Sequence, residues 1–374
     1  MSRSELGELL CRRALGSGGR NTERRLIAVR NKSEYDRCLA RLKQEGVNPV
    51  KSLRGAGLLC VHADKRRDWS EIKAHPSVRF VEKDAVVRTH GALRRTVKRS
   101  AAAGVPWNVT RVQAPVLWPR TRGGGVRIAV MDTGIGPHPD LVVAGGVNTT
   151  GGRSFRDDNG HGTHVAGIAA GRGGRRGRAG VAPRVSLYAV KVLGSDGLGF
   201  ISDIVEGIEW CRARRIRVIN MSFGLPPGVE SRAMREAVRR AYRSGIAIAA
   251  SAGNAGRASG GLDSPAGYPE TIAVAACTRG NRIAGFSSRG RGIAVAAPGS
   301  AIRSTWPGGG YRTMSGTSMA APHAAAGAAL LLGLRGNLRP AAVKRAMRRG
   351  AGSLGFAVRA QGAGLLQLQN AART

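Results

Sequence analysis

The sequence predicts an α/β protein built on a mostly parallel sheet with helices on both faces, preceded by a small α+β domain. Beyond residue 105, strand-like apolar runs alternate with helical runs, an order typical of an open parallel sheet. The strand-like runs are continuous and rich in alanine and β-branched residues, as strands buried on both faces require. With 374 residues, the chain is long enough for two domains.

The elements of the large domain follow from these runs. Strands are expected at 126–131, 187–192, 216–221, 245–250, 271–276 and 292–296, and helices near 162–170, 202–214, 230–243 and 318–333. In such a sheet the reactive side chains gather at the carboxyl ends of the strands. Asp132, Ser222 and Asn254 each follow a strand-like run, so we expect them to lie at one edge of the sheet.

The chain divides into four predicted parts. Residues 1–23 are polar and Gly-rich, and are expected to be disordered. Residues 24–88 predict the small α+β domain, with strand and helix patterns of its own. Residues 89–104 form a basic linker without apolar periodicity, where proteolysis concentrates. Residues 105–374 form the large domain.

Three polar residues stand in short motifs in the order Asp, His, Ser. Asp132 ends an apolar run, His161 opens a His-Gly-Thr-His motif, and Ser318 opens a helical run of small residues. A serine nucleophile needs a base to take its proton, and the base needs an anion to fix its tautomer. Each residue alone has a simpler explanation as a turn, packed or helix-start residue. Together they predict nucleophilic catalysis.

From about Val105 to about Ala371 the chain resembles the subtilisin family of serine endopeptidases. The Asp-His-Ser order is that of subtilisins and differs from the chymotrypsin and α/β-hydrolase orders. The motifs that carry the resemblance, besides those of the trio, are Val105-Pro106-Trp107-Asn108-Val109, Ala114-Pro115-Val116-Leu117-Trp118, Val181-Ala182-Pro183, Tyr188-Ala189-Val190-Lys191-Val192-Leu193, Val218-Ile219-Asn220-Met221-Ser222-Phe223-Gly224, Ser251-Ala252-Gly253-Asn254, Ser264-Pro265-Ala266 and Ala297-Pro298-Gly299.

The resemblance implies a serine endopeptidase that hydrolyses peptide bonds through an acyl-enzyme. In that interpretation His161 deprotonates Ser318, and Asp132 stabilises the resulting imidazolium. The side chain of Asn254 and the backbone N–H of Ser318 hold the oxyanion. Two edge segments bind a polypeptide substrate as an added strand: Gly197, Leu198 and Gly199, and Ser222, Phe223 and Gly224.

The resemblance also implies how the enzyme is made. The run Val78-Arg79-Phe80-Val81-Glu82-Lys83-Asp84 resembles the closing strand of subtilisin propeptides. Residues 24–88 are therefore expected to be the chain's own intramolecular inhibitor, and the protein a self-processing zymogen. The alternative is an unrelated small domain.

Through Ser264-Pro265-Ala266 and Tyr268-Pro269, the resemblance also places Asp263 at the base of the S1 pocket, which receives the P1 residue on the amino side of the cleaved bond. A buried carboxylate is costly unless it is paired, so the sequence predicts a preference for Arg or Lys at P1. Lys98-Arg99 immediately precedes Ser100, which fits a mature chain beginning near Ala101. The alternative is that Asp263 turns to solvent, or to a surface arginine, and does not select the P1 side chain.

No cofactor is required for this chemistry, and the metal signals are weak. His161 and His164 have the spacing of a metal pair, but no further His or Cys lies near them in the sequence, so zinc is not expected. Asp140 corresponds to a calcium ligand of secreted subtilisins. The partner loop 171–179 carries four arginines, which repel a dication, so calcium is a doubtful ligand. The five cysteines lack CxxC spacing and are expected to be buried thiols.

The net charge of +37 is not matched by a nucleic-acid recognition motif, and aromatic residues make up only 4% of the chain. Such charge supports only nonspecific binding to anionic polymers, so we expect no specific nucleic-acid partner. No run approaches the ~20 apolar residues that span a bilayer, so no membrane partner is expected, and the protein is expected to be a monomer.

Location and activity each leave alternatives. No signal peptide is visible at the N-terminus; the resemblance favours secretion, and a cytoplasmic location stays open. Two rival functions are a catalytically silent subtilase that serves as a scaffold and a binder of anionic polymers. The intact trio and Asn254 argue against the first.

Overall fold

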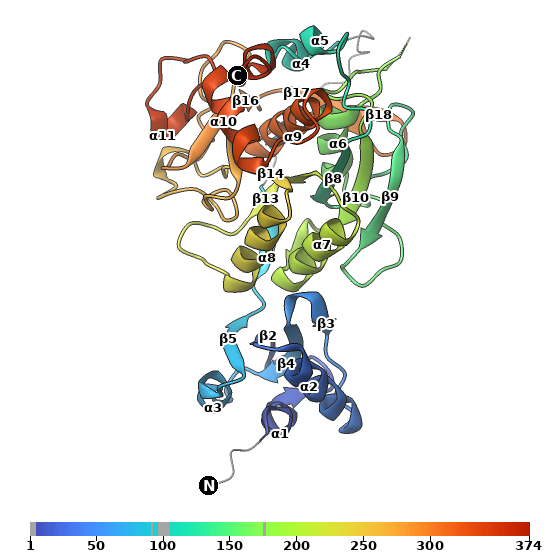
Figure 1. Ribbon diagram of the computed structural model, residues 1–374, viewed down its shortest axis with the longest axis vertical. Helices are drawn as coiled ribbons and strands as arrows, with labels where there is room; N and C mark the ends of the chain where they lie inside the picture. Colours follow the sequence, from blue (N-terminus) through green and yellow to red (C-terminus); the bar gives the residue numbers. More distant parts are fainter. Residues whose placement is uncertain (1–4, 91–92, 96–104, 175–176) are drawn as a thin grey trace.

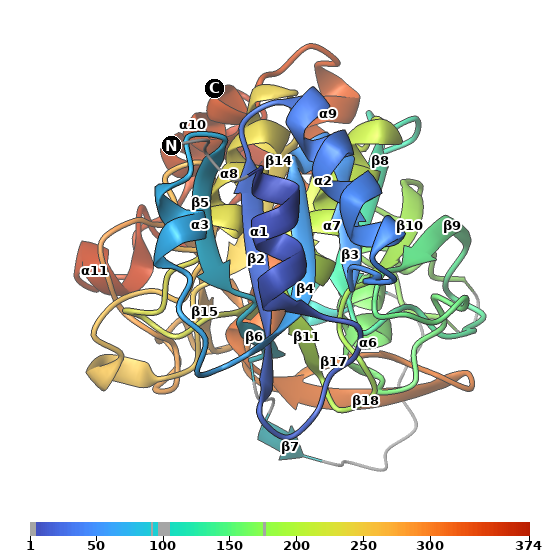
Figure 2. The same ribbon diagram turned by 90° about the horizontal axis from the view of Figure 1, so that it is seen from below.

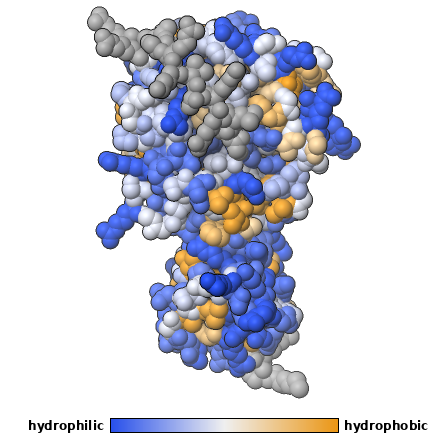
Figure 3. All heavy atoms as spheres, turned by 180° about the vertical axis from the view of Figure 1, so that it is seen from behind, coloured by the Kyte–Doolittle hydropathy of each residue, from blue (hydrophilic) through white to orange (hydrophobic). Residues whose placement is uncertain are grey.

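The structure is a computed structural model that describes residues 5–90, 93–95, 105–174 and 177–374. A small N-terminal domain lies below a much larger domain, and the chain passes from one to the other after β5 (Figure 1). Seen from behind, hydrophilic residues dominate the surface of both domains (Figure 3), in keeping with the high charge.

The large domain is built on a parallel sheet, as predicted. Seven strands of the described chain form it, in the order β16-β15-β14-β12-β8-β10-β9. Their bounds are β16 (Ile293–Pro298), β15 (Ile272–Cys277), β14 (Ala247–Ser251), β12 (Val218–Met221), β8 (Arg127–Asp132), β10 (Ser186–Lys191) and β9 (Val143–Asn148). The six predicted strands are confirmed. The edge strand β9 was not predicted, because its two glycines hide the β-branched pattern.

Helices cover both faces of this sheet. Alternate residues of β8 point to opposite faces: Ile128 and Val130 pack with α6 and α9, whereas Ala129 and Met131 pack with α7 and α8. These four helices are α6 (His161–Ala170), α7 (Ile201–Ala213), α8 (Arg232–Arg243) and α9 (Thr317–Leu334). They match the four predicted helices. By length and composition α9 could cross a membrane, but 89% of it is buried, so it is a core helix of this domain.

The rest of the large domain consists of shorter elements around the sheet. They are α4 (Trp107–Arg111), α5 (Ala114–Leu117), η2 (Gly256–Ala258), β17 (Ile302–Trp306), β18 (Gly310–Ser315), α10 (Pro340–Gly350), α11 (Val358–Gln361) and α12 (Leu368–Ala371). Strands β17 and β18 form an antiparallel hairpin beside α6. All five cysteines of the chain are free, and four of them are buried.

The N-terminal domain is an antiparallel sheet with three helices on one face (Figure 2). Its elements are α1 (Leu6–Arg13), β1 (Ala14–Leu15), β2 (Thr22–Val29), α2 (Lys32–Gln44), β3 (Lys51–Leu53), η1 (Arg54–Ala56), β4 (Leu58–Asp64), α3 (Ser70–Ala74) and β5 (Val78–Lys83). Side chains of β2 alternate: Ile27 and Val29 face α1 and α2, whereas Leu26 and Ala28 share a core with α7 and α8. The second face of this sheet is therefore buried against the large domain.

The expectation that residues 1–23 are disordered is wrong for the part that the structure describes. Leu6, Leu9 and Leu10 have helical spacing, and all three are buried in the core of the N-terminal domain. Strand β1 extends the domain's sheet by pairing with β4. The prediction averaged the composition over a Gly-rich stretch and missed this short amphipathic helix.

The end of the predicted small domain and the described part of the predicted linker, residues 89–90 and 93–95, lie against the large domain. Strand β6 (Val86–Thr89) is inserted between β11 (Leu198–Phe200) and β13 (Phe223–Gly224) of the large domain. Strand β7 (Leu93–Arg95) pairs antiparallel with β18. Lys98, Arg99 and the expected start near Ala101 lie outside the described residues.

Candidate active site

Three polar residues end neighbouring strands at the carboxyl edge of the sheet. Met221 of β12 pairs with Met131 of β8 on one side and with Ala250 of β14 on the other. The next residues along these strands are Asp132, Ser222 and Ser251, and all three are fully buried. In a parallel sheet, residues at the same register lie side by side. The strand register thus places these residues together.

Asp132 and His161 form a buried pair. The Oδ1 atom of Asp132 lies 2.7 Å from Nδ1 of His161. A carboxylate only accepts, so Nδ1 carries the hydrogen and Nε2 presents a lone pair; among the described residues Nε2 has no hydrogen-bond partner. Burial lowers the pKa of His161, but the charge and hydrogen bond of Asp132, with Asp157, outweigh it and raise the pKa on balance. The arrangement gives a histidine that is ready to accept a proton.

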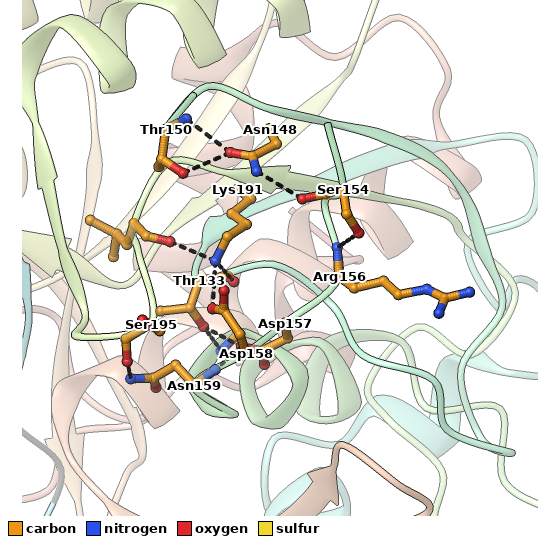
Figure 4. Close-up of polar contacts among 12 residues, drawn as sticks. Thr133, Asn148, Thr150, Ser154, Arg156, Asp157, Asp158, Asn159, Lys191 and Ser195 are labelled. Carbon is orange, nitrogen blue, oxygen red and sulfur yellow. Dashed lines mark hydrogen bonds and ion pairs between the residues drawn. The ribbon is translucent and has the colours of Figure 1, made fainter. Parts of the chain in front are cut away.

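Asp157 contacts Thr133, the residue that follows Asp132 (Figure 4). Its Oδ1 accepts from Thr133 Oγ1 at 2.8 Å and from Gly160 N at 2.8 Å, and its Oδ2 accepts from Thr163 N at 2.9 Å. Thr133 Oγ1 in turn accepts from Gly162 N at 2.9 Å. Asp157 therefore caps α6 and joins its first turn to the end of β8. No role was predicted for it, because it lies three residues before Gly160, the N-cap residue of α6, and so is not at the position where a capping signal is expected.

A buried lysine holds the neighbouring strand ends together. Lys191 Nζ donates to the carbonyl of Thr133 at 2.8 Å, the carbonyl of Leu193 at 3.0 Å and the carboxylate of Asp158 at 2.7 Å (Figure 4). Its side chain is only 4% exposed, so these partners satisfy a charge that would otherwise be costly to bury. Lys191 therefore fixes the loop that precedes His161 against the ends of β8 and β10.

Ser318 stands in the first turn of α9. Its hydroxyl donates to the carbonyl of Ser222 at 3.0 Å, and the hydroxyl of Ser222 donates back to the carbonyl of Ser318 at 3.0 Å. The free N–H groups and dipole of a helix N-terminus favour negative charge. These two bonds bring Ser318 to the edge where Asp132 and Ser222 leave the sheet.

Asn254 faces the same helix start. Its Oδ1 accepts from the backbone N and from Oγ1 of Thr317, each at 2.9 Å. The amide nitrogen lies on the other side of the carboxamide, beside Gly316, where an added Cβ would lie 3.2 Å from Asn254 Nδ2. The amide donor is thereby held next to Ser318.

The two predicted edge segments flank one strand of the chain itself. Strand β6 pairs with β11 through Leu198 and Gly199, and with β13 through Phe223 and Gly224. The backbone N of Thr89 donates to the carbonyl of Gly197 at 3.0 Å. The structure therefore brings Gly197–Gly199 and Ser222–Gly224 together as the two sides of a peptide channel that β6 fills.

Asp263 lies at the end of this channel and is 9% exposed. Its Oδ2 is 2.8 Å from Nε2 of His90, and Nδ1 of His90 is 2.7 Å from Oγ of Ser251. The carboxylate is thus turned into the protein, and its described partner is a histidine. Sequence reasoning found Asp263 but missed His90 and Ser251.

Comparison with known proteins identifies the family. Residues 123–365 match the sequence model of the Subtilase family, Peptidase_S8. The chain belongs to the subtilase family. It is 42% identical to Subtilisin BL of Lederbergia lenta over 274 residues, which cover 73% of this chain and 100% of that protein. It is 39% identical to an alkaline protease of Alkalihalobacillus alcalophilus over 308 residues, or 82% of this chain and 77% of the relative.

A further relative is Subtilisin E of Bacillus subtilis (strain 168), 42% identical over 310 residues that cover 81% of this chain and 77% of that protein. The subtilase is thus a hydrolase, a serine-type endopeptidase of the subtilisin class. The resemblance stated from the motifs is confirmed.

His164 of the subtilase is a packed residue. It is fully buried, and its Nε2 contacts the carbonyls of Ile302 at 3.1 Å and Arg312 at 3.0 Å. Burial lowers its pKa to about 3. Among the described residues no group of three or more His, Cys, Asp or Glu side chains could hold a metal ion. His164 joins α6 to the β17–β18 hairpin.

Asp140 does not fit a calcium site. Its Oδ2 accepts from the backbone N of Arg178 at 2.7 Å and from the hydroxyl of Tyr311 at 2.6 Å. An added Cβ on Gly177 would lie 2.0 Å from Oδ1, so the loop closes over the carboxylate. Calcium needs oxygen ligands, whereas N–H and O–H donors and a guanidinium side chain surround Asp140.

Proposed function

We propose that this subtilase is an endopeptidase with an Asp132–His161–Ser318 triad and that it is made as a self-processing zymogen. One observation carries the proposal: β6 of the chain's own N-terminal region lies in the peptide channel and leads to the edge where Ser318 stands. A substrate would bind there in the same way, as a strand added between β11 and β13.

The first step is attack by Ser318. Its hydroxyl turns from the carbonyl of Ser222 to Nε2 of His161, which takes the proton as Oγ adds to the peptide carbonyl. Asp132 holds the tautomer of His161 and stabilises the imidazolium. The backbone N–H of Ser318 and the amide of Asn254 receive the oxyanion, and one such donor contributes about 10²–10³-fold in kcat, a magnitude for which subtilisin itself is the reference case.

The second step releases the products. His161 gives its proton to the leaving amine as the C–N bond breaks, and the acyl group stays on Ser318 as an ester. Water then attacks the ester with His161 again acting as base. The products are a new carboxylate, a new amine and the regenerated serine. The residues of this chain supply every proton transfer.

We infer that the N-terminal domain is the intramolecular inhibitor of this enzyme. Glu82 caps α8 through the backbone N of Arg232 at 2.9 Å, and Asp84 caps α7 through the backbone N of Ser202 at 2.8 Å. Carboxylates at helix N-termini are stabilising by about 1 kcal/mol each. Lys51 adds an ion pair to Asp203 at 2.8 Å. These contacts support a domain that holds β6 in the channel and excludes other polypeptides.

A serine-directed phosphonate or sulfonyl fluoride tests this function. The wild-type enzyme should hydrolyse a protein substrate, lose activity with the reagent and carry the adduct on Ser318 in peptide mass spectra. Ser318→Ala should give a folded chain of full length with about 10⁶-fold less activity, the loss for which subtilisin is again the reference. Hydrolysis or normal processing by pure Ser318→Ala would contradict the proposal.

The same assay separates the rival functions. A silent scaffold would take up no reagent and cleave nothing, and a binder of anionic polymers would show salt-dependent binding without hydrolysis. Family membership favours a secreted enzyme that acts on polypeptides as a monomer.

A further inference from the structure

His90 is held by polar groups from a strand and a loop of the large domain, Ser251 at the end of β14 and Asp263 in the loop before β15. It is 5% exposed, and both of its ring nitrogens are engaged: Nε2 by Asp263 at 2.8 Å and Nδ1 by Ser251 at 2.7 Å. Neither contact is part of the Asp132–His161–Ser318 chemistry. They join the N-terminal region to the large domain at a buried point that the mechanism does not use.

The strand register places His90 at the nucleophile. Arg88 pairs with Gly224 and Thr89 with Phe223, so the next residue, His90, comes opposite Ser222. The carbonyl of Ser222 is the group that accepts the hydroxyl of Ser318. A peptide strand that reaches this position presents its carbonyl carbon to Ser318.

After His90 the described chain resumes at Leu93. Leu93 of β7 pairs with Ser315, three residues before Ser318. The large domain therefore pairs with the chain before His90 through β11 and β13, and with Leu93–Arg95 through β18. A substrate is held in this way on both sides of the bond that is cut. The bond at the nucleophile is the one that follows His90.

The groups around the imidazole match both of its nitrogens. Because the carboxylate of Asp263 only accepts, Nε2 carries a hydrogen. The hydroxyl of Ser251 donates to Nδ1 of a neutral ring and accepts from Nδ1–H of a charged one. Two glycines leave room for the ring and the carboxylate: an added Cβ would lie 2.8 Å from His90 Nε2 at Gly224, and 2.5 Å from Asp263 Oδ1 at Gly253.

We infer that Asp263 and Ser251 select histidine at P1 and that the first self-cleavage of the chain falls between His90 and Gly91. This rests on the proposed function and narrows it to one kind of bond. It also replaces the expectation of Arg or Lys at P1 and of a first cut near Lys98-Arg99.

Other side chains fit this pocket less well. A phenylalanine would leave the buried Asp263 carboxylate unpaired, and a site built to hydrogen-bond its ligand strongly rejects an analogue that lacks the polar group. Asp263 already reaches an atom four bonds from the Cα of His90, whereas the amine of lysine and the terminal nitrogens of arginine lie farther out. Those longer side chains would have to fold back within a pocket that His90 fills.

The cleavage balances as ordinary hydrolysis. Ser318 Oγ adds to the carbonyl carbon of His90, and His161 passes the serine proton to the nitrogen of Gly91 as the C–N bond breaks. One water then cleaves the ester. His90 is left with a free carboxylate, and Gly91 becomes the new amino terminus.

The first test follows maturation of the full chain by intact-mass and terminal-peptide spectrometry. Wild type should release a fragment that ends at His90. His90→Phe, which keeps a ring of similar size, should slow this cut by on the order of 10- to 100-fold. The matched control Lys98→Ala/Arg99→Ala removes the basic alternative and should make the first cut at the unchanged rate.

Two results would overturn the inference in this test. One is a first fragment that ends at Arg99 or elsewhere while the His90–Gly91 bond is intact. The other is loss of processing in Lys98→Ala/Arg99→Ala with His90→Phe processed normally. Thermal unfolding of His90→Phe in a Ser318→Ala background shows whether the precursor still folds.

The second test uses the mature enzyme and so does not depend on precursor folding. Matched peptides with His, Arg or Phe at P1 should give the highest kcat/KM for His. Asp263→Asn should lower the His-to-Phe ratio by on the order of 10- to 100-fold, and Ser251→Ala by less. An unchanged ratio in Asp263→Asn, or a preference for Arg over His, would overturn the inference.

Failure of the inference is distinguishable from failure of the proposed function. If peptides are cleaved without preference for His, the protease assignment stands and the pocket assignment falls. If no peptide is cleaved and Ser318 takes up no phosphonate, the protease assignment itself falls.

Discussion

Two buried aspartate–histidine pairs lie within the described part of this subtilase, one in the proposed triad and one in the proposed P1 pocket. Asp132 and His161 are joined at 2.7 Å, and Asp263 and His90 at 2.8 Å. The first pair is formed within the large domain, whereas the second joins the large domain to the N-terminal region. The same contact therefore serves two purposes. On the proposed function, the pair that stays after cleavage orients a base, and the pair that leaves with the product recognises a substrate.

Breaking the Asp132–His161 pair, called here the permanent pair, should have the larger effect on activity. Asp132→Asn keeps the shape of the side chain but removes the charge and favours the wrong tautomer of His161, which we expect to lower kcat by about 10⁴-fold. The measurement is kcat on a peptide substrate at a pH where wild type is fully active. Glu270→Gln, which removes a carboxylate paired with Arg239 at 3.0 Å outside the site, is the control and should retain most activity. Equal losses in the two variants would contradict the role of Asp132.

Removing the oxyanion donor beside the permanent pair is expected to cost less. Asn254→Ala should lower kcat by about 10²–10³-fold with KM little changed, because the amide acts mainly in the transition state. Steady-state kinetics on one substrate separate the two constants. A rise in KM at constant kcat would show that Asn254 binds the ground state instead.

The permanent pair also sets the acid limit of activity. His161 accepts a proton only when it is neutral, and its pKa is raised above the ordinary 6.5. The value of kcat/KM should therefore fall tenfold per pH unit below a midpoint that lies above pH 6.5. The measurement is a pH profile from pH 5 to pH 9 with a substrate that does not titrate. A midpoint below pH 6.5 would contradict the raised pKa.

The Asp263–His90 pair, called here the transient pair, can be broken without changing any residue of the mature enzyme. The segment 1–90, added separately, should inhibit the mature enzyme at micromolar concentration, because its last residues fill the channel. His90→Ala in that segment should weaken inhibition by about tenfold, the loss expected for a hydrogen bond to a charged group. Arg66→Ala, whose side chain is 78% exposed and pairs with Asp64 of its own domain, should inhibit normally. No difference between these two variants would contradict the pairing of His90 with Asp263.

The smallest effect concerns buried histidines outside both pairs. Burial lowers the pKa of His164 to about 3 and that of His323 to about 4. Because both values lie below the unfolded 6.5, their stabilisation is full above pH 6.5 and is lost as the pH falls toward 4. Each histidine should cost on the order of 1 kcal/mol per pH unit. Urea unfolding of Ser318→Ala at pH 7, 5.5 and 4.5 measures this, and adding His323→Asn should flatten the slope.

Short contiguous patterns made the fold and the predicted nucleophile readable from the sequence. Asp132, His161 and Ser318 each sit beside glycines and small residues in distinctive order, and the buried parallel strands are unbroken apolar runs. The side chains that hold these three residues in place could not be predicted from the sequence. Lys191 and Thr133 meet only because β8 and β10 are neighbours, and the polar partners of Lys191 are mostly backbone carbonyls.

The specificity pocket shows the same limit more sharply. Asp263 could be predicted because a motif anchors it, but its partner His90 lies 173 residues away in the sequence, and the other nitrogen of that ring contacts Ser251. The basic pair Lys98-Arg99 is the more conspicuous signal in the sequence, and it drew the prediction of the first cut. The proposed cut after His90 depends instead on the position of β6 along β13, and strand register is a tertiary property that a single sequence does not reveal.

The insertion of β6 between β11 and β13 has a kinetic consequence. On the proposed function, each molecule folds with one bond already at its own Ser318, so the first cut should be a unimolecular event whose half-life is independent of protein concentration. Holding reactants in place in this way can be equivalent to an effective concentration of about 10⁵ M or more. The rate of later cleavage between molecules falls on dilution, whereas the rate of the first, intramolecular cut should not. The position of β6 is therefore expected to set the time between folding and the first cut, which occurs once in each molecule.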